Sequence, residues 1–198
     1  MPDVRVRLHQ NILWLVLDKQ PLNLLATTML EQLTVALRTA LKQPLHLIVI
    51  TGMGEHAFCA GVDLPDDSEN RRTELLHAAN ETSAAFEELH ARGLPIVALV
   101  KGSAFGVGCE LVSLCDIVIA REDALFRLPA INAKVFPSAL SVYLPAAIGQ
   151  EATTRLVQSG ETLNAQEAMR LGLVHQLLPT RRFLLDTEEL LVMLATQR

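Results

Sequence analysis

The sequence predicts an α/β fold in which helices alternate with the strands of a largely parallel sheet. Three short, uninterrupted apolar runs have the pattern of strands buried on both faces, at residues 45–51, 96–100 and 117–120. One amphipathic helical pattern precedes the first run and another separates it from the second. Strands and helices that alternate in this way form βαβ units, whose right-handed crossovers place the helices outside the sheet. Because no repeat or Pro/Gly linker divides the chain, we expect residues 1–198 to form one domain.

The N-terminal part is expected to supply a hairpin and a helix. Residues 4–8 and 12–17 are rich in β-formers and are separated by Asn11, which suits a tight turn. From residue 26 to 41, apolar side chains recur every four positions, as on one face of an amphipathic helix. They are Met29, Leu33, Leu37 and Leu41.

A loop is expected over residues 52–70, followed by a second helix that Gly93-Leu94-Pro95 ends. The apolar stripe of this helix consists of Leu75, Ala79, Phe86 and Leu89. Beyond Pro137 the chain is predicted to be mostly helical. One helix covers residues 165–172, where Gly172 suits the position just after a helix end, and a short strand at 173–177 follows.

Composition excludes several classes of function. Half of the 198 residues are hydrophobic, a fifth are charged and the net charge is −5, with no basic cluster larger than two arginines, so we expect no binding to nucleic acid. No apolar run approaches the roughly 18–20 residues of a membrane span, and the N-terminus lacks the apolar core of a signal peptide. Three cysteines match neither a disulfide framework nor a zinc pattern. We therefore expect a cytoplasmic protein without a membrane partner or a metal.

A glycine-rich turn follows the strand predicted at 96–100. Gly106-Val107-Gly108 open a helix that continues with Cys109-Glu110-Leu111. The first N–H groups of a helix have no partner within it and carry the positive end of the dipole, so they suit an oxyanion, with Glu110 in the same turn. A purely structural turn remains an alternative. A dinucleotide fingerprint is excluded because Leu111 stands where its third glycine is required, and a P-loop is excluded because no Gly-Lys-Ser/Thr follows.

A second stretch of small residues, 52–64, follows the strand predicted at 45–51. Gly61 would leave the backbone N–H of Val62 free to point into a cleft. Two such turns at the carboxyl ends of parallel strands lie where open α/β sheets bind ligands.

Together these segments resemble the crotonase (enoyl-CoA hydratase/isomerase) family. Residues 57–64, AFCAGVDL, match the family pattern A-F-x-A-G-x-D-[LI], and residues 102–116, GSAFGVGCELVSLCD, match G-x-A-x-G-G-G-x-E-L-x-x-x-C-D in nearly every position. Further matches are the P-x-N turn at 21–23, F-x-x-P-x-I at 126–131 and the stretch at 160–174. The likeness covers about residues 4–179.

The resemblance implies a crotonase-like ββα spiral (the ClpP/crotonase fold) that binds a CoA thioester. The thioester oxygen would lie in an oxyanion hole made by the N–H groups of Val62 and Val107, with Glu110 as the catalytic proton-transfer group. A hydratase of the family uses a second glutamate where this chain has Ala130. The implied activity is hydration or dehydration of an enoyl- or dienoyl-CoA by a lyase, with no cofactor because CoA is part of the substrate.

The resemblance also implies substrate-binding positions beside the two turns. They are Ala60, Gly61, Asp63, Leu64, Gly106, Ala130, Pro137 and Tyr143. For two of them a structural role competes: Asp63 could brace its own loop, and Tyr143 could pack with its hydroxyl at an edge. Residues 134–149, with the turn at 21–23, are similar to a subgroup that hydrates cyclic dienoyl-CoA esters.

Members of the family continue into C-terminal helices that cover CoA and join subunits into trimers. We expect a short helical tail over residues 180–198, and a homo-trimer or hexamer. Two rival functions are compatible with parts of this pattern. Ala130 motivates a non-catalytic binding or assembly protein on the same fold. A Clp-type serine peptidase needs a nucleophilic serine beside the oxyanion turn, where this chain has Phe105, Val107 and Cys109.

Overall fold

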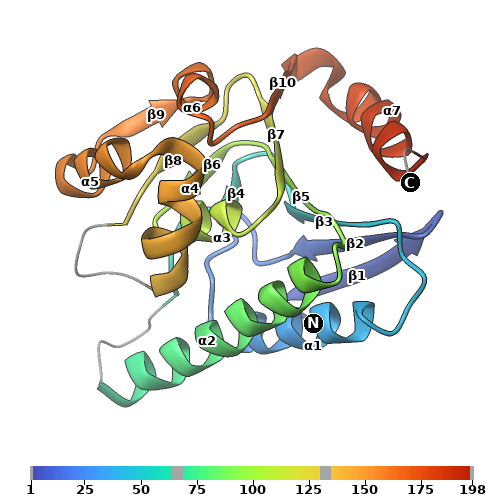
Figure 1. The fold of residues 1–198 in the computed structure, drawn as a ribbon, viewed down its shortest axis with the longest axis horizontal. Coiled ribbons are helices and arrows are strands. Elements are labelled where there is room, and N and C mark those ends of the chain that lie inside the picture. The colour runs from blue at the N-terminus through green and yellow to red at the C-terminus, as the bar shows by residue number, and fades with distance from the viewer. Residues whose placement is uncertain (1, 64–68, 130–134, 197–198) are drawn as a thin grey trace.

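The structure is a computed structural model that describes residues 2–63, 69–129 and 135–196. Its strands form two sheets (Figure 1). The larger sheet has six strands in the order β1-β2-β3-β5-β7-β10, and the smaller has four in the order β4-β6-β8-β9. The predicted α/β class is confirmed. The strands are β1 Val4–His9, β2 Ile12–Leu17, β3 Leu47–Gly52, β4 Ala57–Cys59, β5 Ile96–Val100, β6 Ser103–Phe105, β7 Ile117–Arg121, β8 Leu125–Arg127, β9 Thr162–Asn164 and β10 Gln176–Leu178.

Helices cover the larger sheet on both faces. The α-helices are α1 Thr27–Ala40, α2 Glu69–Ala91, α3 Val107–Ser113, α4 Leu144–Ile148, α5 Gln150–Ser159, α6 Ala165–Leu171 and α7 Phe183–Thr196. A π-helical turn, Ala139–Tyr143, precedes α4, and a 3₁₀ turn, Thr180–Arg182, precedes α7. Among the described residues, no helix has the length and apolar character needed to cross a membrane.

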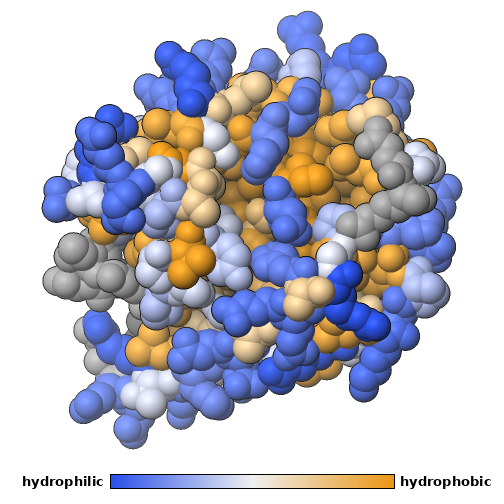
Figure 2. Space-filling model, in the orientation of Figure 1, coloured by the Kyte–Doolittle hydropathy of each residue, from blue (hydrophilic) through white to orange (hydrophobic). Residues whose placement is uncertain are grey.

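Alternation along the strands separates two apolar cores. Ile48 and Ile50 of β3 face the main core, where α1 and α2 lie side by side, whereas Leu47 and Val49 face α7. In such a strand every side chain is buried, which is why the sequence shows a continuous apolar run rather than an alternating one. Figure 2 shows a hydrophobic area in the middle of one molecular face, surrounded by hydrophilic residues.

The hairpin, the first two helices and the three buried strands form where the sequence predicts them. β1 and β2 are antiparallel, and β2, β3, β5, β7 and β10 are successively parallel. Gly172 takes φ 93° at the end of α6, as expected for a helix terminus. The predicted strand at 173–177 is shifted: β10 starts at Gln176, because the backbone N–H groups of Leu173 and Val174 still bond to Ala168 of α6.

The smaller sheet was not predicted. Residues 52–70 were expected to form a loop, but residues 57–59 form β4, which pairs in parallel with β6. β6 pairs in parallel with β8, and β9 joins β8 antiparallel. Each of these strands has only three residues, too few to leave a periodic pattern in the sequence.

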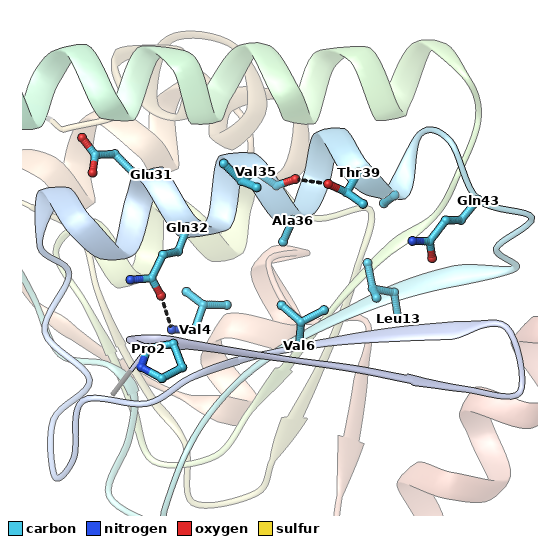
Figure 3. A pocket seen from close by; sticks show the side chains of 11 residues that line it. Pro2, Val4, Val6, Leu13, Glu31, Gln32, Val35, Ala36, Thr39 and Gln43 are labelled. Carbon is cyan, nitrogen blue, oxygen red and sulfur yellow. Dashed lines mark hydrogen bonds between the residues drawn. The ribbon is translucent and has the colours of Figure 1, made fainter.

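A shallow apolar groove of about 510 Å³ lies between the hairpin and α1. Val4, Val6 and Leu13 point from the strands toward Val35 and Ala36 of the helix (Figure 3). The Gln32 side chain closes one end by accepting a hydrogen bond from the N–H of Val4. The groove is formed by elements other than those that carry the two glycine-rich turns.

Candidate active site

The two turns singled out in the sequence meet because they follow neighbouring parallel strands. The turn with Val62 comes after β4, and the turn with Val107 comes after β6. Parallel neighbours end at the same edge of a sheet, so the turns lie together there. The strands that precede them belong to the smaller sheet, whereas the sequence suggested the ends of residues 45–51 and 96–100.

Glycine at position 108 allows α3 to lie directly against β4. A Cβ atom at Gly108 would stand 2.0 Å from the carbonyl oxygen of Cys59 and 2.9 Å from its Cβ. No side chain can occupy that space without moving the helix. The close contact sets the position of the N-terminus of α3 relative to the loop that begins at Ala60.

The Val62 N–H faces away from the segment that holds its loop. Leu25 and Val62 form an isolated parallel bridge, in which the N–H of Leu25 donates to Gly61 and the C=O of Leu25 accepts from Asp63. In a parallel bridge the residue between those two bonds directs its own N–H to the other side. Within the described part of the chain, the Val62 N–H donates no backbone hydrogen bond.

The unusual backbone angle of the second turn lies at Gly106, not at Val107. Gly106 has φ 55° and ψ −120°, a conformation that glycine adopts readily, and its N–H donates to the C=O of Arg127. Val107 is the first helical residue and is 2% exposed, so its isopropyl group packs in the core. Within residues 2–63, 69–129 and 135–196, its N–H donates no backbone bond, since the first bonds of the turn come from Cys109 and Glu110.

Glu110 is fully buried, at 0% exposure, in the first turn of α3. One oxygen of its carboxyl group accepts hydrogen bonds from the backbone N–H groups of Val135 and Phe136, both at 3.2 Å. Helical side chains lean toward the N-terminus of their helix, so this carboxyl group leans toward the end that carries the Val107 N–H. A buried carboxylate needs such donors.

Sequence reasoning missed Val135 and Phe136 as partners of the glutamate. Both act through main-chain N–H groups, which every residue except proline has, so their side chains carry no signal. They follow directly after residues 130–134, the segment that includes Ala130. Ala130 and Leu64 lie outside the described residues, and their predicted contacts with substrate stay predictions.

The other predicted substrate contacts differ in their surroundings. Ala60 and Gly61 are half-buried and bonded to the turn at 22–25, and Pro137 is exposed. Asp63 forms an ion pair with Lys19, which supports the interpretation that Asp63 braces its loop.

Tyr143 packs against the end of α2, near Asp116. Its ring centroid lies 5.7 Å from that of His90, and burial, then the negative charges of Glu87 and Asp116, raises the pKa of its hydroxyl. These contacts fit the packing role. That Tyr143 also lines an acyl pocket stays a prediction.

All three cysteines are free and buried, two of them beside the turns. Burial raises the pKa of Cys59 to about 11, and burial together with the charge of Glu110 raises that of Cys109 to about 12. The pKa of Cys115 is also raised by burial, and then by Asp116.

We expect the folded protein to resist alkylation, because the reactive thiolate is scarce until the pH approaches these values. Iodoacetamide at about pH 8 should leave the intact mass unchanged, and the unfolded chain should gain three adducts, one for each cysteine. Rapid modification of Cys59 or Cys109 in the native protein would contradict this burial.

Comparison with known proteins agrees with the geometry. The sequence matches the family described as enoyl-CoA hydratase/isomerase over residues 7–198. It is 35% identical to 2,3-dehydroadipyl-CoA hydratase of Escherichia coli over 91% of this chain and 71% of that protein. It is 30% identical to carnitinyl-CoA dehydratase of Proteus mirabilis over 91% of this chain and 69% of that protein.

Solved structures show the same fold. DspI of Pseudomonas aeruginosa superposes with a TM-score of 0.89 at 25% identity, covering 100% of this chain and 76% of that one. An enoyl-CoA hydratase/isomerase family protein from Silicibacter pomeroyi gives a TM-score of 0.85 at 30% identity, covering 98% of this chain and 84% of that one. The fold is the crotonase-like spiral, and the chain belongs to the enoyl-CoA hydratase/isomerase family.

Proposed function

We propose that this protein is an acyl-CoA lyase that adds water to, or removes it from, the double bond next to a CoA thioester. The observation that carries the proposal is the meeting of two turns whose Val62 and Val107 N–H groups are free of backbone partners among the described residues. Glu110 is buried in the same helical turn as Val107. The relatives named hydratase and dehydratase support this reaction class.

The thioester oxygen would accept hydrogen bonds from the Val62 and Val107 N–H groups. When water attacks the β-carbon, the electron pair of the double bond moves toward that oxygen and forms an enolate. Donors fixed in advance stabilise this charge without reorganisation, and each is worth about 3 kcal/mol of transition-state stabilisation.

Glu110 would move the proton. Its carboxylate takes a proton from the attacking water while the hydroxyl group adds to the β-carbon. The same proton is then delivered to the α-carbon as the enolate collapses, so that one water is added and Glu110 is again a carboxylate. Ala130 has no group that could share this work. One carboxyl group therefore serves as base and then as acid.

A panel of CoA thioesters tests the proposal. The purified protein is incubated with crotonyl-CoA, 2,3-dehydroadipyl-CoA and a cyclic dienoyl-CoA, and loss of the conjugated double bond is followed by ultraviolet absorption. Turnover of one or more esters supports the proposal. Failure to turn over or bind any of them would remove it.

The second candidate is a non-catalytic binding protein on the same fold, favoured by the alanine at position 130. Calorimetry with the same esters separates the two functions. Binding without turnover assigns the protein to this second function, whereas turnover that Glu110→Gln abolishes assigns it to the first.

We also propose one domain, a cytoplasmic location, a homo-trimer or hexamer, and no cofactor other than the CoA of the substrate. Free buried thiols fit a reducing compartment. Exposed apolar side chains on α7 offer a surface that a second copy could cover. They are Leu184, Leu185, Val192 and Met193.

A further inference from the structure

The turn at residues 19–25 runs along the loop that carries Val62. The C=O of Leu22 accepts the N–H of Ala60 at 3.0 Å, and Leu25 bonds to Gly61 and Asp63 at 2.9 Å each. These bonds hold the residues before and after Val62 to the same turn, and they leave the Val62 N–H on the opposite side of the loop. The position of the turn therefore fixes the direction in which the Val62 N–H points.

Asn23 fastens this turn to the rest of the protein. Its side chain is 0% exposed, and its Nδ2 donates to the C=O groups of Met53 and Ala57 at 2.9 and 2.8 Å. Its Oδ1 accepts from the N–H of Lys19 at 3.1 Å. Ala57 is the first residue of β4, the strand that leads to Val62. One amide thus connects the turn with both ends of the segment between β3 and β4.

The position demands asparagine on two grounds. Its backbone has φ 50°, which asparagine tolerates better than most residues with a Cβ atom. Its side chain supplies two donors to two carbonyl groups and one acceptor to an N–H. Glycine would suit the backbone but leave all three partners unsatisfied, and aspartate would place a carboxylate oxygen against the two carbonyl groups.

We propose that Asn23 is a positioning residue for the oxyanion hole. It does not touch the substrate. It holds the turn that contains Leu22 and Leu25 against β4. This turn then directs the Val62 N–H toward the thioester oxygen. The inference rests on the proposed function, because it assigns that N–H to the developing enolate.

Asn23→Gly tests the role of the side chain without straining the backbone. Because a misplacement of about 1 Å can cost about 100-fold in rate, kcat should fall about 100-fold while KM stays within about threefold. We expect kcat to change more than KM because the Val62 N–H stabilises the charged oxygen of the transition state more than the neutral oxygen of the bound substrate. Binding of butyryl-CoA, a saturated ester, should change little.

Asn23→Asp adds a signature that a merely structural role would not give. The buried carboxyl group facing two carbonyls favours its neutral form, and only that form can donate a hydrogen bond. Activity of this variant relative to wild type should therefore be lowest at alkaline pH, where the carboxyl group is ionised, and rise as the pH falls. A ratio that is flat across the pH range contradicts the proposal.

Asn164→Ala is the matched control. It removes an asparagine that caps α6 by accepting the N–H of Glu167 at 2.9 Å. Asn164 ends β9, which lies at the opposite edge of the smaller sheet from β4. This variant should lose stability and keep kcat. If Asn23→Gly keeps kcat within about threefold of an active wild type, the positioning role is overturned.

The positioning role of Asn23 can be tested separately from the proposed function. If wild type turns over no ester, that function fails, and crystal structures of wild type and Asn23→Gly decide the positioning role. A rotated Val62 peptide in the variant supports it, and an unmoved peptide overturns it.

Discussion

Glu110→Gln is expected to lower kcat about 1000-fold, within the range by which positioned acid–base groups accelerate reactions. Glutamine keeps an oxygen that can accept the N–H groups of Val135 and Phe136, so the helix and the segment after residue 134 stay bonded. It cannot take a proton from water. KM should change little, because the lost interaction belongs to the transition state.

Steady-state rates on the best ester of the panel measure this effect, and thermal unfolding shows that the fold is kept. Glu161→Gln is the matched control, because it makes the same change at an exposed carboxylate whose described partner is Arg155, at 3.4 Å. It should leave kcat unchanged. A Glu110→Gln variant with kcat within about threefold of wild type would show that another group moves the proton.

Gly108→Ala is expected to damage stability and rate together. The added methyl group would stand 2.0 Å from the carbonyl oxygen of Cys59, so α3 must move away from β4. Overpacking of this kind costs about 1–3 kcal/mol of the free energy of unfolding. Because the displaced helix carries the Val107 N–H, kcat should also fall about 100-fold.

Urea unfolding and steady-state kinetics report the two effects. Gly160→Ala provides the comparison: it has φ 62° at the end of α5, and nothing lies within 4 Å of an added Cβ. It should cost about 1 kcal/mol through backbone strain and leave kcat unchanged. Equal kinetics for Gly108→Ala and wild type would mean that the contact with Cys59 does not set the oxyanion geometry.

Uninterrupted apolar runs made three neighbouring strands of the larger sheet, β3, β5 and β7, predictable from sequence. The strands at residues 47–52, 96–100 and 117–121 are buried on both faces, so polar side chains occur only near their ends, at Thr51 and Arg121. The smaller sheet was not predictable, because β4 and β6 are three residues long and their pairing depends on contacts with distant parts of the chain. Yet these two strands bring the two turns together.

The candidate site was predictable where it depends on glycines and on a charged side chain. Gly106 and Glu110 were identified because each supplies something that few residues can: a backbone with positive φ, and a carboxyl group in a helical first turn. The hydrogen-bond donors to Glu110 were not predictable, because they are the main-chain N–H groups of Val135 and Phe136. The sequence identifies Asn23 only as part of a turn, because its three hydrogen-bond partners become neighbours only in the folded chain.

Because the Val107 side chain is buried in the core, the N–H that this turn offers does not depend on which side chain stands at position 107. The isopropyl group packs among core atoms, while the N–H beside it donates no backbone hydrogen bond among the described residues. The residues that can replace Val107 are then limited by the volume of the core and by the need for an N–H, which excludes proline. Under the proposed function, any other residue that fits the core here would leave the N–H in place for the thioester oxygen, so the polarising group does not depend on which side chain stands at this position.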